Sequence, residues 1–410
     1  MILRLYRNFR MIWIGQVVSV VGDGMQRVAL LWWARQTGGN GLLTAVALST
    51  MIPVIACSPL GGWLADRYDR RVLMMSADIA RVVVTATLAV LVLTHHSNAV
   101  LLCVLVAVSA VATAVFDPTY SATVPSLIPK EHRQAANGLN MANSAVGGLV
   151  GPLIGGVLIA SFGVGTVLVV NAVTFVWSAA FVAMSHLPRP AGATPEAKQE
   201  CTTRAAVGGV LRDRQLRRLV GLASVLNMIA APVPLLVVAL AVDRFHAGAA
   251  SYGLLEVMVS AGILIGALSA AKFAGSSIAP PMLLTGVCLG IAGLLPFAAS
   301  ATVFVIGGAA IALANTALIT RFQNSVRAEV QGRVFGVVGA LGEALRPAGL
   351  ALGAPLLAIV GVSGAFVVIG GGVIMATLAW GLPIRGASAV PAGEMTATEV
   401  QASEVPASVA

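Results

Sequence analysis

Apolar stretches long enough to cross a lipid bilayer recur along almost the whole chain, from Phe9 to Leu382. A transmembrane helix needs about 20 consecutive, mostly apolar residues. Twelve stretches meet this requirement, at 9–35, 42–65, 72–94, 98–120, 138–162, 165–187, 216–242, 250–271, 280–299, 302–322, 333–360 and 363–383. The in-out alternation of a membrane barrel does not occur in them. The sequence therefore predicts an all-α membrane protein with twelve transmembrane helices.

Composition excludes an ordinary water-soluble domain. Of 410 residues, 58% are hydrophobic and only 10% are charged, against about 25% charged in typical soluble domains. So few charges cannot cover a surface that faces water. The first apolar stretch is also too long for the core of a cleavable signal peptide, and no small-residue cleavage site follows it.

The positive charge of the chain follows its expected topology. The formal net charge is +9, and most of the 25 lysines and arginines lie in the termini or in the connections from even-numbered to odd-numbered spans. The opposite connections contain only Arg35 and Arg244. Positive residues stay on the cytoplasmic side, so both termini are expected in the cytoplasm. This distribution accounts for the charge without a nucleic-acid partner.

The chain divides near its midpoint into two similar halves. We expect an N-terminal six-helix half at 1–187, a cytoplasmic linker with an amphipathic helix at 188–215, a C-terminal six-helix half at 216–385 and a disordered tail at 386–410. Asn137-Gly138 before span five corresponds to Gln331-Gly332 before span eleven, 194 residues later. The expected halves are therefore pseudo-symmetric, and duplicated halves with a binding site at the membrane midplane are a recurrent transporter architecture.

The connection between spans two and three carries the most specific motif, which reads GWLADRYDRR from Gly62 to Arg71. It resembles the signature loop of the major facilitator superfamily, Gly-x-Leu-Ala-Asp-Arg-x-Gly-Arg-Lys, and departs from it at Asp69 and Arg71. The resemblance implies a conformational latch that closes the cytoplasmic side, formed by Gly62, Asp66, Arg67, Arg70 and Arg71.

Two contacts are expected of this loop. Asp66 and Arg70 are four residues apart on a helix and can pair, and the latch partner is expected at the start of span eleven, near Gly332-Arg333. The alternative is that these arginines serve only to fix topology.

Span five contains a second motif, GGLVGPLIGG from Gly147 to Gly156. It resembles the Gly-x-x-x-Gly-Pro-x-x-Gly-Gly motif of exporters in the same superfamily, with Gly147, Gly151, Pro152, Gly155 and Gly156 at the matching positions. Small residues in one stripe let another helix approach closely, so a packing role alone is the alternative. Similar segments elsewhere place the chain near the siderophore exporters and macrolide efflux proteins. The Arg-x-x-x-Gly motif of many drug/proton antiporters is absent from span four, so their proton relay is not transferred.

Ionisable residues inside a bilayer are costly and are functional candidates by default. Asp23 and Arg27 lie one turn apart in span one, where they could form a partly buried pair, and Glu343 and Arg346, three residues apart in span eleven, offer a second acid and base; Glu256 lies in span eight. A carboxylate in an apolar cavity takes up a proton more readily than one in water. We therefore expect these five residues to bind protons or substrate, Asp23 first, with structural ion pairing as the alternative.

Other polar or aromatic residues in the spans are weaker candidates. Residues that can line the cavity are Gln16, Trp32, Trp33, Asn143 and Asn227, and residues expected to be structural are Asp78, Arg81 and Asp117.

Together these features predict a secondary transporter of the bacterial plasma membrane that moves a small molecule by alternating access. The span-five motif favours export, with protons as the exchanged ion. The chain carries no nucleotide-binding loop and no nucleophile motif, so we expect neither an enzyme nor a cofactor or metal. The expected partners are a small-molecule substrate, protons and the lipid bilayer, for a protein that works as a monomer. The alternatives are an uptake symporter of the same fold, a membrane acyltransferase or a membrane sensor without transport.

Overall fold

The computed structural model describes residues 2–96, 98–187, 214–270, 277–325 and 338–381. The central linker, the tail and the expected latch partner at 332–333 lie outside these residues. The described chain is helical and contains no strand. Its elements are α1 (Ile2–Leu5), α2 (Arg7–Arg67), α3 (Arg70–Leu93), α4 (Ala99–Leu127), η1 (Lys130–His132), α5 (Arg133–Phe162), α6 (Val164–Met184), α8 (Arg214–Ala230), α9 (Val233–Ala239), η3 (Leu240–Arg244), α10 (Ala249–Ser269), α11 (Ala279–Ala292), α12 (Phe297–Ser325), α14 (Arg346–Ala351), α15 (Gly353–Ala376) and η5 (Thr377–Gly381).

Nine helical segments in the described residues are long and apolar enough to cross a membrane. This number is consistent with twelve spans because some of the helices contain more than one expected span. The 61-residue α2 contains the first two spans and leaves helical geometry at Gly38 and Gly39. Helix α15 leaves it at Gly361, between the last two expected spans. The expected ninth span is the short α11, of 14 residues.

Two expected helix ends are wrong. Span four was expected to end at residue 120, but α4 continues to Leu127 through Pro118 and Pro125. Asp117 therefore lies well inside a helix instead of at its end. Span nine was expected at 280–299, but α11 ends before Gly293 and α12 begins at Phe297. Apolar composition continues through this turn, so hydropathy alone does not reveal it.

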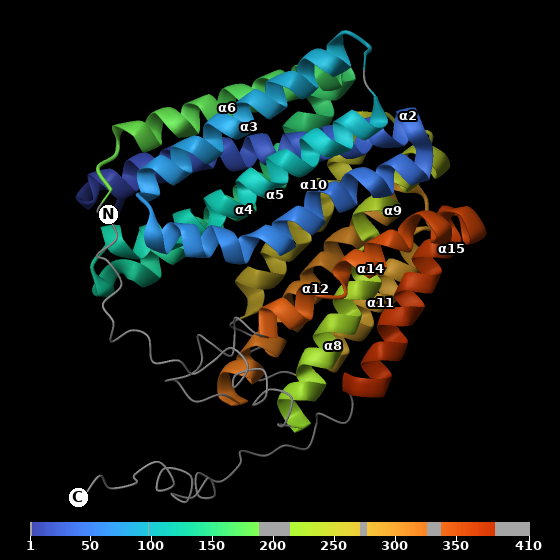
Figure 1. Cartoon of the computed structure of the whole chain (residues 1–410). Coiled ribbons are helices and arrows are strands. Elements are labelled where there is room, and N and C mark those ends of the chain that lie inside the picture. The colour runs from blue at the N-terminus through green and yellow to red at the C-terminus, as the bar shows by residue number, and fades with distance from the viewer. Residues whose placement is uncertain (1, 97, 188–213, 271–276, 326–337, 382–410) are drawn as a thin grey trace, which may run out of the picture.

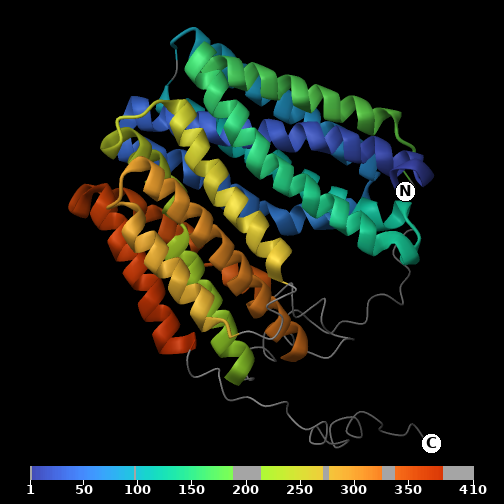
Figure 2. The same cartoon turned by 180° about the vertical axis from the view of Figure 1, so that it is seen from behind.

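The helices form two bundles, one from α2 to α6 and the other from α8 to α15 (Figure 1). They converge at the end that contains the Gly38-Gly39 break, α9 and the start of α15. From there they diverge towards the end at which the N-terminus lies, as the reverse view also shows (Figure 2). We call the first end the joined end and the second the open end.

The two bundles repeat one another residue by residue. A Cβ on Gly151 of α5 would touch Gly24 of α2, and a Cβ on Gly349 of α14 would touch Met228 of α8. Gly349 lies 198 residues after Gly151, and Met228 lies 204 residues after Gly24. Gly163 and Gly361 are also 198 residues apart and share an unusual backbone conformation, with φ of +81° and +67°. The spacing between the halves is therefore 204 residues early in each repeat and 198 later, in place of the 194 residues expected from the Asn137-Gly138 and Gln331-Gly332 motifs.

Candidate functional site

A charged cluster lies inside the N-terminal bundle, where α2, α3, α4 and α6 meet. Asp78 and Arg81 are one turn apart on α3, and the Nη2 group of Arg81 donates a hydrogen bond to Oδ1 of Asp78. The Ser178 hydroxyl of α6 donates to the other carboxylate oxygen of Asp78 at 2.8 Å. Both charged residues are buried. A buried ion pair of this kind is tolerated because each charge has a partner, although the buried Nε of Arg81 has no hydrogen-bond partner among the described residues.

Two aromatic rings enclose the Arg81 guanidinium group. Its central carbon lies 4.3 Å from the ring centre of Phe116 on α4 and 4.5 Å from that of Phe175 on α6. Cation–π attraction favours this arrangement, and the flat guanidinium group fits between rings better than an ammonium group does. Arg81 is thus fixed by one carboxylate and two rings.

Asp23 occupies the exposed side of this cluster. Its Oδ2 atom lies 4.0 Å from Nη1 of Arg81, and 45% of its side chain is exposed. Asp117 of α4 is also exposed and is close enough to interact electrostatically with both Asp23 and Arg81. Three carboxyl groups therefore surround one arginine, and Asp23 is held less tightly by that arginine than Asp78 is.

The expected pairing of Asp23 with Arg27 is wrong. Arg27 instead donates to Glu256 of α10 at 3.2 Å, across the two bundles. The two residues do share a side of α2, but neighbouring helices bring each of them a partner in better position. Sequence reasoning also treated Asp78, Arg81 and Asp117 as structural; the three-residue spacing of Asp78 and Arg81 inside an apolar helix was the available signal.

Further contacts join the bundles towards the joined end. Arg35 pairs with Asp243 of η3, and Trp32 stacks on Tyr252 of α10 with ring centres 6.1 Å apart. Tyr252 is fully buried, and its hydroxyl has no hydrogen-bond partner. Trp32 thus lies between the bundles, whereas the neighbouring Trp33, also expected near the cavity, belongs to the buried core.

In the C-terminal bundle, Arg346 donates to Glu343 at 2.7 Å, and both side chains are partly exposed. The Asn227 amide of α8 donates to the Gly342 carbonyl at 3.0 Å and lies 3.5 Å from Glu343. Glu343 and Arg346 therefore form an ion pair, and Asn227 connects this pair to α8.

The glycine motif of α5 packs on both bundles. Cβ atoms on Gly147, Gly151 or Gly155 would meet α2 at distances of 2.2–3.0 Å. Gly156 faces the other bundle, where a Cβ would lie 2.8 Å from the Ala249 carbonyl and 3.1 Å from Gly253. Pro152 lies in the same buried stripe. These small residues let α2, α5 and α10 approach closely.

The signature loop is organised by backbone contacts. Arg70 donates to the carbonyls of Ala65 and Ala122, at 3.2 and 2.8 Å, so the expected Asp66–Arg70 pair is wrong. Arg71 donates to the carbonyl of Ala183. The last carbonyl groups of a helix have no partner within that helix. These arginines donate hydrogen bonds to carbonyls near the C-terminal ends of α2, α4 and α6.

The remaining residues of the loop have simpler roles. Gly62 has open space where a Cβ would stand, and Arg67 lies over the ring of Trp63 at 5.4 Å. A latch that involves Asp66 remains a prediction, because its expected partner lies outside the described residues.

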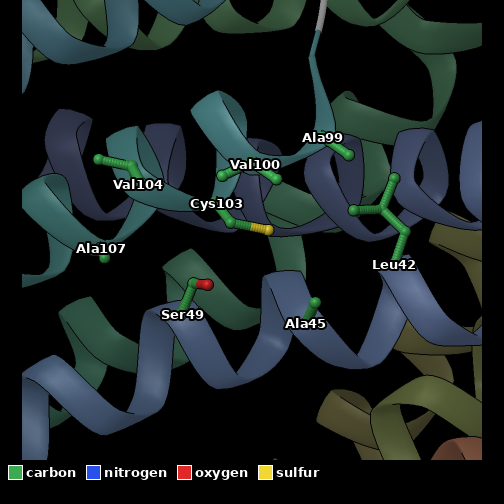
Figure 3. Close-up of a pocket in the computed structure, with 8 residues that line it drawn as sticks. All are labelled: Leu42, Ala45, Ser49, Ala99, Val100, Cys103, Val104 and Ala107. Carbon is green, nitrogen blue, oxygen red and sulfur yellow. The ribbon is translucent and has the colours of Figure 1, made fainter.

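A groove of 430 Å³ lies elsewhere, between α4 and the second part of α2 (Figure 3). Its lining is apolar except for Ser49 and the thiol of Cys103. Val100 and Val104 at its rim are strongly exposed, as expected of side chains that face lipid. None of the described residues that line the groove is charged, and the groove is separate from the cluster around Arg81.

The two bundles, their internal repeat, the buried ion pair inside the first bundle and the ion pairs between the bundles are features of a polytopic membrane transporter. Residues 12–350 match the family model of the Major Facilitator Superfamily, and the chain belongs to this family. It is accordingly a transporter of small molecules, with a membrane as its setting, and not an enzyme.

Several relatives are similar to this chain over most of their length. The chain is 23% identical to macrolide efflux protein A of Streptococcus pyogenes, over 89% of this chain and 94% of that protein. It is 26% identical to the multidrug efflux pump Tap of Mycobacterium tuberculosis, over 86% and 88%. An uncharacterized MFS-type transporter of Bacillus subtilis is 29% identical over 87% and 88%.

Solved structures share the fold. A bacterial homologue of the lysosomal transporter Spinster, in an inward-facing and unoccupied conformation, superposes with a TM-score of 0.73 at 15% identity, over 92% of this chain and 97% of that one. An inward-facing bacterial homologue of the iron transporter ferroportin gives 0.71 at 14% identity, over 92% and 98%.

Proposed function

We propose that this protein exports a drug-like or secreted small molecule in exchange for protons, and that Asp23 is the acid that carries the proton. Among the candidate acids, Asp23 is the one held least tightly by an arginine. Its counterion, Arg81, is 4.0 Å away and is already hydrogen-bonded to Asp78, while Asp23 itself is 45% exposed. By contrast, Glu256 and Glu343 each have an arginine within 3.2 Å.

Charge balance supports the same choice. Asp23, Asp78 and Asp117 surround a single arginine, so the fully ionised cluster has excess negative charge. Uptake of one proton relieves this excess, and Asp23 can exchange it because its side chain is not enclosed. A bound cation relieves it equally well, so proton and cationic substrate compete for one position. This competition is the basis of the proposed exchange.

Export is supported by the α5 glycine motif and by two relatives, a macrolide efflux protein and a multidrug efflux pump. With both termini in the cytoplasm of a bacterial cell, the joined end faces outwards and the open end inwards. Alternating access then requires the Arg27–Glu256 and Arg35–Asp243 pairs to break while the signature loop closes the opposite end. The two bundles of a single chain complete this cycle, so we propose a monomer.

The test uses inverted membrane vesicles with an acidic interior. Wild-type vesicles should accumulate erythromycin or the hydrophobic cation tetraphenylphosphonium in a manner that depends on the pH gradient. Asp23→Asn should abolish this accumulation at an equal amount of protein in the membrane. Glu131→Gln is the matched control, because it neutralises an exposed carboxylate of η1 that lies outside both the Arg81 cluster and the signature loop. Gradient-driven accumulation by Asp23→Asn equal to wild type would exclude Asp23.

A further inference from the structure

A small pocket lies in the C-terminal bundle, between α8, α11, α12 and α15. Its volume is 80 Å³, and its polar lining comes from Asn227, Thr285 and Asn315 on three different helices. A water molecule occupies about 30 Å³ in the liquid, so the pocket can hold a group of only a few heavy atoms. Asn315 is exposed at its rim, and Asn227 connects it to the partly exposed Glu343.

The internal repeat identifies this pocket as the counterpart of the Arg81 cluster. Asn227 lies 204 residues after Asp23, and Thr285 lies 204 residues after Arg81. Asn315 lies 198 residues after Asp117. These are the spacings shown by the paired glycine contacts of the two bundles, and the positions equivalent to the buried Met74 and Leu88 of α3 are the buried Ile278 and Ala292 of the α11 region. The alignment of the two halves therefore rests on residues that do not line the pocket.

The different side chains at these equivalent positions explain why this site is filled in the N-terminal half and leaves a pocket in the C-terminal half. Where the N-terminal half has Arg81 between Phe116 and Phe175, the C-terminal half has Thr285, Ala314 and Val373. The second set of side chains is much smaller, so the space of the guanidinium group and its rings is left partly open. Each acid at the equivalent positions is also replaced, Asp23 and Asp117 by asparagine and Asp78 by Met282.

We propose that this pocket is a subsite that binds an uncharged hydrogen-bonding group of the transported molecule, such as a hydroxyl or a carbonyl. The Asn315 amide can both donate and accept hydrogen bonds. The Asn227 amide nitrogen already donates to the Gly342 carbonyl, so Asn227 offers its oxygen as an acceptor, and the Thr285 hydroxyl, which donates to Pro281 at 3.0 Å, also retains acceptor capacity. None of the described residues that line the pocket is ionised, and the nearby Glu343 is already paired with Arg346, so the lining favours an uncharged group. The two halves thus have different roles: the site around Arg81 binds a proton or a charged group, and its C-terminal counterpart binds an uncharged polar group.

Binding by the purified full-length protein tests the subsite, with erythromycin as a probe rich in hydroxyl and carbonyl oxygens. Asn315→Leu should weaken binding by about threefold to tenfold, the loss expected for one or two hydrogen bonds. Ala230→Leu, which fills the pocket without removing a polar group, should have a similar effect. Thr316→Val is the matched control, because Thr316 neighbours Asn315 but does not line the pocket. Asn315→Ser, with a smaller change of shape, replaces Asn315→Leu if that variant melts at a lower temperature than wild type.

A second probe separates recognition from damage. Tetraphenylphosphonium has no hydrogen-bonding group, so its binding should be unchanged in the pocket variants. Equal weakening of both probes, or unchanged erythromycin binding because the pocket holds only water, would overturn the subsite. The choice of erythromycin rests on the proposed function, but the two fail separately. Absence of gradient-driven transport by wild type would refute proton-coupled export, whereas selective loss of erythromycin binding would still establish the subsite.

Discussion

The guanidinium group of Arg27 on α2 meets the carboxylate of Glu256 on α10 at 3.2 Å and so connects the two bundles. The Glu256 side chain is only 12% exposed, whereas that of Arg27 is 53% exposed. The solvent-exposed guanidinium group of Arg27 is therefore paired with a carboxylate of Glu256 that has little contact with solvent. A change at either residue should alter how readily the joined end separates.

Neutralisation of this pair should favour separation of the joined end. Glu256→Gln should shift the population towards the separated state by about 1 kcal/mol, or about fivefold, since a partly exposed pair contributes little more than this. The measurement is the rate at which a maleimide labels a cysteine placed at Tyr252, in a background without the native cysteines. Asp243→Asn, which removes the partner of Arg35, should act in the same direction. Equal labelling rates with and without Glu256→Gln would contradict this role.

Removal of the Arg81 charge should destabilise the N-terminal bundle strongly. Arg81→Met leaves the buried Asp78 without a counterion, for which a loss of about 3–5 kcal/mol in the free energy of unfolding is expected. The melting temperature of the purified protein measures this loss. The double variant Arg81→Met with Asp78→Asn should recover most of it, because it leaves no buried charge unpaired. A double variant no more stable than Arg81→Met would show that the rings, and not the charges, dominate.

Asp117 should contribute to the attraction of cations without carrying the proton. Asp117→Asn removes one of the three negative charges near Asp23, and the KM for tetraphenylphosphonium should rise by about tenfold, the effect of one unit charge acting over several ångströms in a partly hydrated site. Accumulation should still depend on the pH gradient, in contrast to Asp23→Asn. Loss of that dependence would instead make Asp117 the proton carrier.

Gly156 should be required for the close contact between α5 and α10. A Cβ there would lie 2.8 Å from the Ala249 carbonyl, which is too close for the backbone to accommodate without movement. Gly156→Ala should therefore raise maleimide labelling at the joined end and slow transport. The matched control is Gly148→Ala, whose Cβ would make an ordinary contact of 3.5 Å with the Ser260 hydroxyl. Equal behaviour of the two variants would mean that the joined end does not depend on this contact.

Hydropathy predicted the fold class well because the bilayer imposes both length and composition on each span. The two halves and the glycine stripe on α5 were also visible in the sequence. Helix ends were predicted less well where apolar residues continue through a turn, as between α11 and α12. Hydropathy reports how apolar a segment is, and it contains no information about where the chain turns.

The partners of the buried charges were the least predictable feature. Asp23 and Arg27 are one turn apart, which makes a pair possible but does not exclude competitors on other helices. Arg81 and Glu256 are such competitors, at sequence distances of 58 and 229 residues from their partners. Helix periodicity contains no information about contacts of that range. The empty counterpart of Arg81 was equally hidden, because it depends on the register between the halves.

The contrast between Arg81 with its two rings and the small side chains at the equivalent C-terminal positions also bears on how such a chain can change over time. A substitution beside Arg81 risks an unpaired ion in a region without water, so the N-terminal half tolerates few changes. A substitution at Ala230, Thr285 or Val373 alters only shape and neutral polarity. Under the proposed division of roles, new cargo would be acquired through substitutions in the second half of the chain, while the residues around Arg81 stay unchanged.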